Sequence, residues 1–385
     1  MIVGNAYALS PPSSESVARV PHSDKVPTIK IFTNKKQTID TTTGNNSPFK
    51  RQTVIMNGMS RTLFFKTEIV TNDSLIQIED VKKVGQHDKS MLDFFQNAYL
   101  SYEKQGFDHH HMSTIVDSSG KKRIGLVPAV CNPNVPEDIL QKLPMWKKVG
   151  FYCNEFTTPI FDHTLETILN SMTSARNGAL ELVANPQTTP YILTCSPGHH
   201  AGFKYYSGYC YLNNAFFAAK TITTIDSFAK VAILDLDYHA GDGTQDIFES
   251  NAGHEFNFYP VSLNINPVHD YPHYKGFDDS KHFLTFEPKC TIEQYITLVK
   301  RATDLIKKEN CTHLVVAFGA DTYMNDPENL ESSRTLIDVP DYIRIGRAVQ
   351  EIGLPTMVVQ EGGYDLGAIG DIVKNFFVGL AVRSS

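Results

Sequence analysis

Four short apolar runs, each followed at once by polar residues and glycine, constrain the fold of this chain more than any other feature. They cover residues 191–193, 231–234, 314–318 and 357–359. Near-continuous apolar strands separated by helical patterns are typical of a parallel sheet that is buried on both faces. We therefore predict an α/β fold with a mostly parallel central sheet and helices on both faces, the connecting helices lying at 213–224, 292–307 and 340–352.

The polar residues that follow these four runs should meet at one place. Ligands of a parallel sheet bind outside the carboxyl ends of its strands, so we expect the four clusters along one edge. The clusters begin at Cys195, Asp235, Gly319 and Gln360. The sequence therefore predicts a single site built from residues that are far apart in the chain.

The rest of the chain shows weaker patterns. Residues 1–27 carry Ser, Pro and Val without periodicity, which predicts an irregular arm. Alternation at 28–33 predicts a first strand, and 165–183 has apolar residues at helical spacing. We expect 103–148 to be a long irregular excursion of the kind used for lids, dimer contacts or substrate rims. It carries a solvated loop of three histidines, His109, His110 and His111.

Composition excludes several classes of protein. The 385 residues carry a formal charge of −7, and no run of like charge forms a binding tail, so nucleic acid is not an indicated partner. No apolar run approaches the roughly 18 to 20 residues of a membrane-spanning helix, and the N-terminus does not resemble a signal peptide. Six scattered cysteines predict buried, reduced thiols and a cytoplasmic or other reducing compartment, with secretion by a non-classical route left open.

The cluster after the second run carries potential metal ligands. Asp235, Asp237 and His239 are spaced by two, so their side chains share one face of an extended backbone. Asp237 and His239 can bind one metal, and Asp321 at the end of a neighbouring strand is the natural third ligand. Three N and O ligands with a position left for water are typical of a catalytic zinc. On its own, an acidic residue at a strand end more often caps the next helix. The metal interpretation is favoured here because four polar clusters are expected at the same edge of the sheet.

Two adjacent histidines, His199 and His200, follow the first run and on their own would indicate a turn with one exposed ring. Asp235 and Asp242 are not needed as ligands, and a carboxylate bonded to one ring nitrogen raises the basicity of the other. Two such dyads beside a metal are the components of general acid and base hydrolysis. Tyr364 follows two glycines and could either pack or donate to a developing oxyanion, and its neighbours favour the donor role.

Five motifs together resemble the zinc-dependent deacetylase superfamily of histone deacetylases and acetylpolyamine amidohydrolases. They lie at 197–202, 207–214, 235–245, 319–321 and 361–364. The resemblance extends from Thr28 to Arg383, so it implies one catalytic domain over 28–385 with the arginase/deacetylase α/β fold. Two further segments are most similar to the acetylpolyamine amidohydrolase branch, 149–154 and 271–277.

The resemblance implies catalytic roles for the residues named above. It implies a zinc ion bound by Asp237, His239 and Asp321. His200 with Asp242 would be the general base and acid, and His199 with Asp235 would be an electrostatic partner. Tyr364 would be the oxyanion donor.

The resemblance further implies a structural potassium ion and a tunnel for the acyl chain. The potassium would be held by the backbone of the two zinc ligands in the second cluster and by Asp235, Ser262 and Leu263. Aromatic walls suit a straight methylene chain. The implied substrate-binding residues are Gly208, Tyr209 and Tyr271.

Two departures from the family pattern bear on the substrate. The polyamine branch has acidic residues that hold the distal ammonium groups, and the aligned positions here are Trp146 and Thr157. A polycation would lose its charge partners, although Glu155 lies close enough to substitute in part, and Trp146 at the rim would offer an apolar face to a peptide. We therefore expect removal of acetyl from acetyl-lysine in proteins or peptides, histones among them, with acetylpolyamine as the alternative substrate.

Two rival functions can be weighed on the same residues. A non-catalytic acetyl-lysine binding module is disfavoured by intact His200, Asp242 and Tyr364. A dinuclear manganese hydrolase of the same fold would need additional His and Asp ligands, and the sequence supplies those for one metal. The excursion at 103–148 resembles the loop through which amidohydrolases of this branch pair, so we expect a homodimer.

Overall fold

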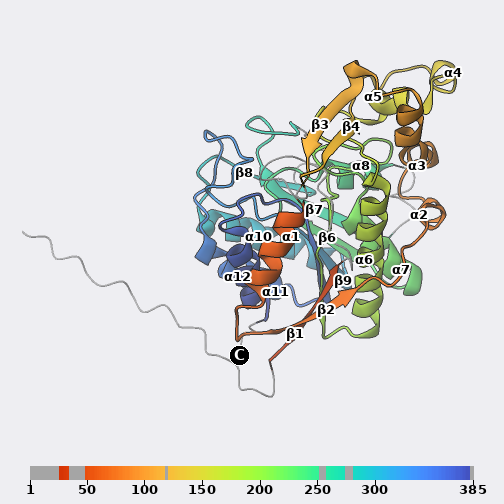
Figure 1. Ribbon diagram of the computed structural model, residues 1–385. Coiled ribbons are helices and arrows are strands. Elements are labelled where there is room, and N and C mark those ends of the chain that lie inside the picture. Colours follow the sequence, from red (N-terminus) through yellow and green to blue (C-terminus); the bar gives the residue numbers. More distant parts are fainter. Residues whose placement is uncertain (1–25, 34–47, 118–119, 251–256, 274–280, 382–385) are drawn as a thin grey trace, which may run out of the picture.

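The computed structural model describes residues 26–33, 48–117, 120–250, 257–273 and 281–381. An eight-stranded sheet with the order β2-β1-β5-β10-β9-β6-β7-β8 forms its centre (Figure 1). Every neighbouring pair in this sheet is parallel, which confirms the predicted sheet. The strands are β1 (Thr28–Thr33), β2 (Lys66–Thr71), β5 (Thr189–Ile192), β6 (Val231–Asp235), β7 (Phe258–Ile265), β8 (Phe283–Phe286), β9 (His313–Phe318) and β10 (Thr356–Gln360).

The four apolar runs of the sequence are adjacent in this sheet. They form β5, β10, β9 and β6, which are consecutive in the strand order. Because these strands are parallel, their carboxyl ends lie along one edge, and the residues that follow them can meet there. Every residue of β6 and β9 is buried, as expected for strands that helices cover on both faces.

Helices cover both faces of the sheet (Figure 1). One side carries α1 (Pro48–Met59), α10 (Ile292–Lys308), α11 (Tyr342–Gln350) and α12 (Ile369–Ala381). The other side carries α3 (Lys89–Lys104), α6 (Thr164–Ala184) and α7 (Asn214–Ile225). Shorter elements are α2 (Ile78–Val84), α5 (Val149–Tyr152), α8 (Asp242–Glu249) and η5 (Val339–Asp341). The predicted helices match α6, α7 and α10, whereas α11 begins two residues after Pro340 because that proline lies in η5.

The central strands send alternate side chains into two apolar layers. In β9, Val316 packs into the layer that includes α10, α11 and α12, whereas Val315 and Ala317 pack into the layer that includes α6 and α7. All three side chains are fully buried. Burying a valine side chain stabilises the fold by about 1.5 to 3 kcal/mol. This two-sided burial explains why the strands appear in the sequence as continuous apolar runs.

Local capping signals set where the helices near the site begin. Asn213 caps α7, since its side-chain oxygen accepts a hydrogen bond from Phe216 N at 2.9 Å. Thr291 and Gln294 form a capping box at the start of α10. Such caps satisfy N–H groups that the first helical turn leaves without intrahelical partners. Because α7 packs on β6 and β9, its capped start also positions the loop between β5 and α7.

The segment 103–148 is more regular than the sequence predicts. It contains an antiparallel hairpin of β3 (Met112–Val116) and β4 (Lys122–Leu126), with η3 (His109–His111), α4 (Glu137–Leu140) and η4 (Met145–Lys148). Arg123 anchors the hairpin through Asp117 and Asp162, each at 2.9 Å. The expectation of a wholly irregular excursion is therefore wrong, because two five-residue strands carry too little pattern to be recognised without these tertiary contacts.

Trp146 lies in the core and does not reach the substrate rim, so it offers no apolar face to a peptide there. Its side chain is 3% exposed, and its ring centroid lies 5.8 Å from that of Tyr102 and 5.0 Å from that of His111. Burial of the large apolar indole decides its position. His109 and His110 are exposed, as expected of a solvated turn, while His111 is half-buried against the tryptophan.

All six cysteines are free and five of them are buried, which confirms the prediction of buried thiols without disulfides. Within the described ranges, no helix combines the length and the apolar character needed to cross a membrane. The predicted arm at 1–27 lies outside the described residues except for its last two positions. The positions 274–277 of one family motif also lie outside them.

Candidate active site

Three potential metal ligands converge at the carboxyl ends of β6 and β9. Asp237 and His239 follow β6, and Asp321 follows β9. One ligand atom from each residue lies within 4.8 Å of the other two. His239 Nδ1 is 3.3 Å from both Asp237 Oδ1 and Asp321 Oδ2. The structure thus brings together the three residues that the sequence proposed as one ligand set.

The chemistry of this cluster fits a divalent cation. Asp321 Oδ2 is buried and accepts no hydrogen bond from the described part of the chain. Burial and the neighbouring Asp237 charge raise the pKa of Asp321 to about 7, which indicates a carboxylate short of compensating positive charge. A Cβ at Gly362 would clash with oxygens of both carboxylates, so only glycine leaves these oxygens free to face one ion. Carboxylate and imidazole are common zinc ligands.

The carboxylates of Asp237 and Asp321 favour a positive charge on His239. Burial alone would lower the pKa of His239, but Asp237 and Asp321 raise it to about 10. Burial opposes charge on Asp237 as well, yet the charge of His199 and the hydrogen bonds from His239 hold the pKa of Asp237 well below its usual value. The site therefore attracts positive charge, which a proton on His239 or a metal ion can supply.

His200 forms a dyad with Asp242 and lines the cavity described below. His200 Nδ1 lies 2.6 Å from Asp242 Oδ1, and Tyr205 donates its hydroxyl to Asp242 Oδ2 at 3.0 Å. Burial and the charge of His199 lower the pKa of His200 to about 4. A neutral ring that donates from Nδ1 leaves Nε2 able to accept a proton. This is the geometry of a general base.

His199 forms the second dyad. Its Nδ1 lies 3.0 Å from Asp235 Oδ2, and its Nε2 lies 3.6 Å from Asp237 Oδ1. Burial opposes charge on the ring, but the carboxylates of Asp237 and Asp235 raise the pKa of His199 well above its usual value. Glu361 Oε2 accepts the backbone N–H of His199 at 3.1 Å and so holds the loop. The two histidines are adjacent in sequence but differ in charge.

Tyr364 is 5% exposed and lines the cavity. Its ring meets that of Tyr209 edge to face at 5.8 Å, and the Arg51 guanidinium lies 4.9 Å from its centroid. Its backbone N–H donates to Asp326 Oδ2 at 2.7 Å. Burial raises the pKa of the Tyr364 phenol well above its usual value, so the phenol keeps its proton and can donate it in a hydrogen bond.

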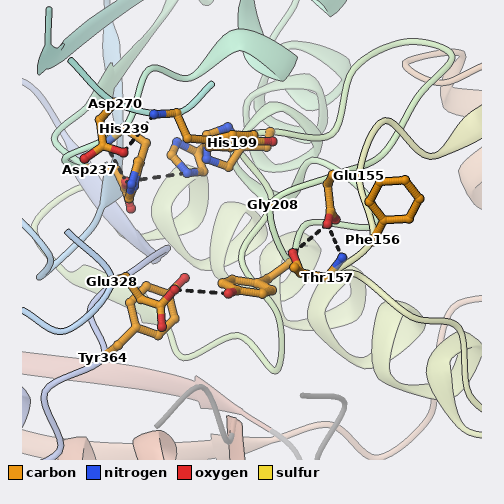
Figure 2. Close-up of a pocket in the computed structure, with 13 residues that line it drawn as sticks. Glu155, Phe156, Thr157, His199, Gly208, Asp237, His239, Asp270, Glu328 and Tyr364 are labelled. Atoms are coloured by element: carbon orange, nitrogen blue, oxygen red, sulfur yellow. Dashed lines mark hydrogen bonds and ion pairs between the residues drawn. The ribbon is translucent and has the colours of Figure 1, made fainter. Parts of the chain in front are cut away.

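These groups surround one cavity of about 320 Å³ (Figure 2). A Cβ at Gly208 would clash with the His200 ring, and Gly208 has a φ of +57°, so both the space and the backbone require glycine there. Asp235, Asp242 and Asp321 lie behind the lining and contact it through their hydrogen bonds and ion pairs. The predicted site residues that line the cavity are His199, His200, Gly208, Tyr209, Asp237, His239, Tyr271 and Tyr364.

The residues implied for potassium lie on the adjacent strands β6 and β7 and in the loop that follows β6. Asp235 is paired with Ser262 in the register of β6 and β7. Ser262 Oγ accepts the Gly241 N–H at 3.3 Å, and Leu263 follows with a buried side chain. The sheet register therefore brings this set close to the Asp235 carboxylate.

Two acidic residues of the cavity wall were missed by the sequence analysis. Asp270 has a structural role, because its oxygens accept hydrogen bonds from Tyr271 N at 2.8 Å and from Ser333 Oγ at 2.9 Å. Glu328 is half-buried, and its Oε2 accepts the Tyr209 hydroxyl at 3.0 Å. Figure 2 shows Glu328 beside Tyr364.

Glu155 turns back over Thr157 at the cavity wall (Figure 2). Its Oε2 accepts both the backbone N–H and the hydroxyl of Thr157. Its Oε1 is buried and, among the described residues, has no hydrogen-bond partner. The position where the sequence predicted a lost carboxylate is therefore occupied by the carboxylate of a neighbouring residue. This agrees with the expectation that Glu155 could substitute in part for the missing carboxylates.

Two further buried carboxylates join the loops of the site. Glu361 accepts the backbone N–H of both Gly198 and His199, which links the loop after β10 to the loop after β5. Asp326 holds the Tyr364 backbone from the loop after β9. Both acids lie near the predicted clusters in the sequence, but an acid in a strand-end loop is usually a helix cap, and spacing alone does not distinguish the two cases.

Comparison with known families agrees with this geometry. The Histone deacetylase domain matches residues 47–380. The chain therefore belongs to the histone deacetylase family, and it is a deacetylase, a hydrolase of linear amides. The crystal structure of acetylpolyamine aminohydrolase from Burkholderia pseudomallei superposes with a TM-score of 0.73 at 21% identity, over 91% of this chain and 98% of that one. This match confirms the expected arginase/deacetylase fold.

Curated relatives place the chain in a branch of the family. Acetylpolyamine amidohydrolase from Mycoplana ramosa is 33% identical over 314 residues, which are 79% of this chain and 84% of the relative. Acetylpolyamine amidohydrolase 1 from Pseudomonas aeruginosa is 31% identical over 303 residues, which are 76% and 80% of the two chains. The chain belongs to the acetylpolyamine amidohydrolase branch, as the motifs at 149–154 and 271–277 predicted.

Proposed function

We propose that this protein is a zinc-dependent acetylpolyamine amidohydrolase, which removes acetyl from one end of a short alkyl chain that carries further ammonium groups. The sequence favoured acetyl-lysine in proteins or peptides and kept acetylpolyamine as the alternative. The relatives named acetylpolyamine amidohydrolase support that alternative and give no support to a preference for peptides or histones. The reversal also has a physical basis in the charges of the cavity wall.

The observation that carries the proposal is the buried Glu155 Oε1, which has no hydrogen-bond donor among the residues that the structure describes. A distal ammonium group would donate to this oxygen, and Glu328 offers a second carboxylate on the same cavity. Charge-assisted hydrogen bonds are roughly twice as strong as neutral ones. A neutral peptide segment at this depth offers only amide donors, and leaving the carboxylate unpaired costs about 1 to 3 kcal/mol or more.

Asp237, His239 and Asp321 would hold the zinc, which when bound supplies a Lewis acid for the amide carbonyl and the attacking water. His200 takes the proton of this water at Nε2, while its Nδ1–H stays on Asp242. The same nitrogen then donates the proton to the departing amine. One ring therefore serves as base and acid in turn.

The remaining polar groups act on the charge that develops at the carbonyl oxygen. Tyr364 donates its phenolic O–H to this oxygen as it becomes an oxyanion. His199, held by Asp235, keeps a positive charge nearby. A potassium ion held by Asp235, Ser262 and Leu263 would add a structural charge behind the catalytic groups.

Acetate release on two substrates tests the proposal. We expect kcat/KM for an acetylated spermidine to exceed that for an acetyl-lysine peptide by at least about tenfold, the value of one charge-assisted contact. An equal or higher value for the peptide would reject the polyamine function while leaving the deacetylase reaction intact.

A variant without the Glu155 charge tests whether this carboxylate causes the preference for an acetylpolyamine. Glu155→Gln keeps an acceptor for Thr157 but removes the negative charge, so it should raise KM for acetylspermidine by about ten- to hundredfold. The same change should leave KM for an acetylated monoamine within about twofold, because that substrate has no distal ammonium. Glu351→Gln, at an exposed position after α11, is the matched control.

A further inference from the structure

Asp326 joins the two loops that carry Asp321 and Tyr364. It is 1% exposed and lies in the loop after β9, five positions beyond Asp321. Its Oδ2 accepts the backbone N–H groups of Tyr364 at 2.7 Å and of Asp365 at 3.3 Å. A single carboxylate thus receives two successive amides from the loop after β10.

The backbone before Tyr364 does not by itself determine where the phenol points. Gly362 and Gly363 precede it, and Gly363 has a φ of +106°, which residues with a side chain rarely adopt. Glycine has more backbone freedom than any other residue, so this pair permits several directions for the chain that follows. Contacts from outside the loop must select one direction, and Asp326 makes the contact with the backbone at the first residue after the glycines.

The second oxygen of the same carboxylate makes a hydrogen bond within the loop after β9. Asp326 Oδ1 accepts the backbone N–H of Glu328 at 3.1 Å, and Glu328 in turn accepts the Tyr209 hydroxyl. One oxygen of Asp326 therefore contacts the backbone of Tyr364, and the other contacts the backbone of Glu328. The side chain itself is absent from the cavity lining, so it cannot touch the substrate directly.

We propose that Asp326 is a positioning residue, whose carboxylate holds the Tyr364 phenol at the place where the amide oxygen develops negative charge. The inference rests on the oxyanion role proposed for Tyr364, and it is independent of whether the substrate is a polyamine or a peptide. An oxyanion donor is effective only when it is directed in advance at the charge that forms. Losing the anchor therefore weakens the reaction step more than the binding of substrate.

The test is a double-mutant cycle on whichever acetylated amine the wild type hydrolyses. Tyr364→Phe should lower kcat by about 10² to 10³. Asp326→Asn replaces one accepting oxygen by an amide group, so kcat should fall by at least about tenfold with KM within about threefold. In the Tyr364→Phe background the same change should have less than about a twofold effect, because the donor it positions is gone.

Asp326→Glu is the second variant, since it keeps the charge but displaces the oxygens by one methylene. It should show the same loss with Tyr364 present and the same absence of effect in the Tyr364→Phe background. Asp365→Asn is the matched control: Asp365 Oδ1 accepts the N–H groups of Gly367 and Ala368 in the same loop, away from the phenol. It should keep kcat within about threefold.

A readout independent of turnover is the position of the phenol in crystal structures of both Asp326 variants, together with their zinc content. We expect a displaced Tyr364 ring, unchanged metal ligands and wild-type zinc. Two results would overturn the proposal: a Tyr364 ring that stays in place, or an Asp326 effect that is equally large in the Tyr364→Phe background. If wild-type protein hydrolyses no acetylated amine, the function fails, and the crystallographic comparison still decides whether Asp326 positions the ring.

Discussion

Asp237 and Asp321 are two buried carboxylates that share one imidazole, His239, at 3.3 Å from each. Two negative charges in a site of low polarity repel each other strongly unless a cation lies between them. Burial and this repulsion together raise the pKa of Asp321 to about 7. At the scale of residues, the cluster is therefore unfavourable for the fold and favourable for metal binding.

The variant Asp321→Asn separates the effect of this carboxylate on the stability of the fold from its effect on metal binding. The amide oxygen can still accept the Tyr238 N–H, which lies 3.0 Å from Asp321 Oδ1, so the fold should survive. Loss of a direct ligand should weaken zinc binding by more than the about 10- to 100-fold that outer partners contribute. Zinc at 100 times its Kd should stabilise the wild type by about 2.7 kcal/mol and leave the variant unchanged.

Thermal unfolding with and without zinc, and metal analysis, measure this prediction. Asp304→Asn, at an exposed position of α10, removes the same charge away from the site and should respond to zinc as the wild type does. Chelation should abolish hydrolysis by the wild type, and zinc should restore it. An Asp321→Asn protein that retains one zinc per chain would show that the third ligand has been misidentified.

Among the contacts between elements, His87 links the start of α7 to the loop that carries His199 and His200, the two histidines with proposed catalytic roles. His87 Nδ1 donates to the Gly202 carbonyl at 2.8 Å, and the Asn213 N–H donates to His87 Nε2 at 3.1 Å. The second bond requires a neutral ring, because a protonated Nε2 has no lone pair to accept it. Burial lowers the pKa of His87 to about 4.

This contact makes the fold sensitive to acid in a defined range. An unfolded histidine has a pKa near 6.5, so between pH 6.5 and about 4 the unfolded chain binds the proton more tightly. The stability from neutral His87 is fully present above pH 6.5 and is lost as the pH falls toward 4. The expected loss is about 3 kcal/mol.

Chemical denaturation of chelator-treated protein between pH 7.5 and 4 measures this effect. His87→Asn cannot titrate, so it should be less stable at neutral pH, and its deficit relative to the wild type should shrink on acidification. The comparison cancels other groups, including His200, that titrate in both proteins. A deficit that stays constant with pH would mean that His87 is not neutral in the folded protein.

At the scale of the whole molecule, the hairpin segment projects from the body of the fold (Figure 1). Several large apolar side chains of this segment and its neighbourhood are exposed: Val116, Val130, Ile139 and Phe156. These four side chains belong to one stretch of the chain, 116–156, and exposed apolar side chains are typical of an interface with another protein where they form a patch. Together with the family resemblance, this favours the homodimer expected from the sequence.

Sedimentation of the wild type and of charge variants tests the dimer. We expect a dimer at micromolar concentration, and Val116→Glu combined with Val130→Glu should shift it to monomer, because burying a carboxylate in an apolar interface costs several kcal/mol. Phe228→Glu, at a side chain that is 90% exposed in the loop between α7 and β6, is the control and should stay dimeric. A fully active wild-type monomer would contradict the prediction.

Local patterns in the sequence were enough to predict a parallel sheet, several of the helices around it and the proposed metal ligands. These features follow from short-range patterns: apolar runs with a strand's length, helical spacing between them, and ligands two residues apart on one backbone such as Asp237 and His239. Since parallel strands place their carboxyl ends together, the grouping of Asp237, His239 and Asp321 required only the order of elements.

The residues at the rim of the cavity could not be predicted from the sequence, because tertiary contacts select them. Trp146 and Thr157 carry no local pattern that tells a core position from a surface one, and packing against Tyr102 placed the indole inside. The bond from Thr157 to Glu155, the Tyr209 contact of Glu328 and the anchoring of Tyr364 by Asp326 depend on loop conformation and on contacts between distant segments. A side chain reaches several ångströms from its backbone, so loop conformation determines which carboxylate enters the cavity.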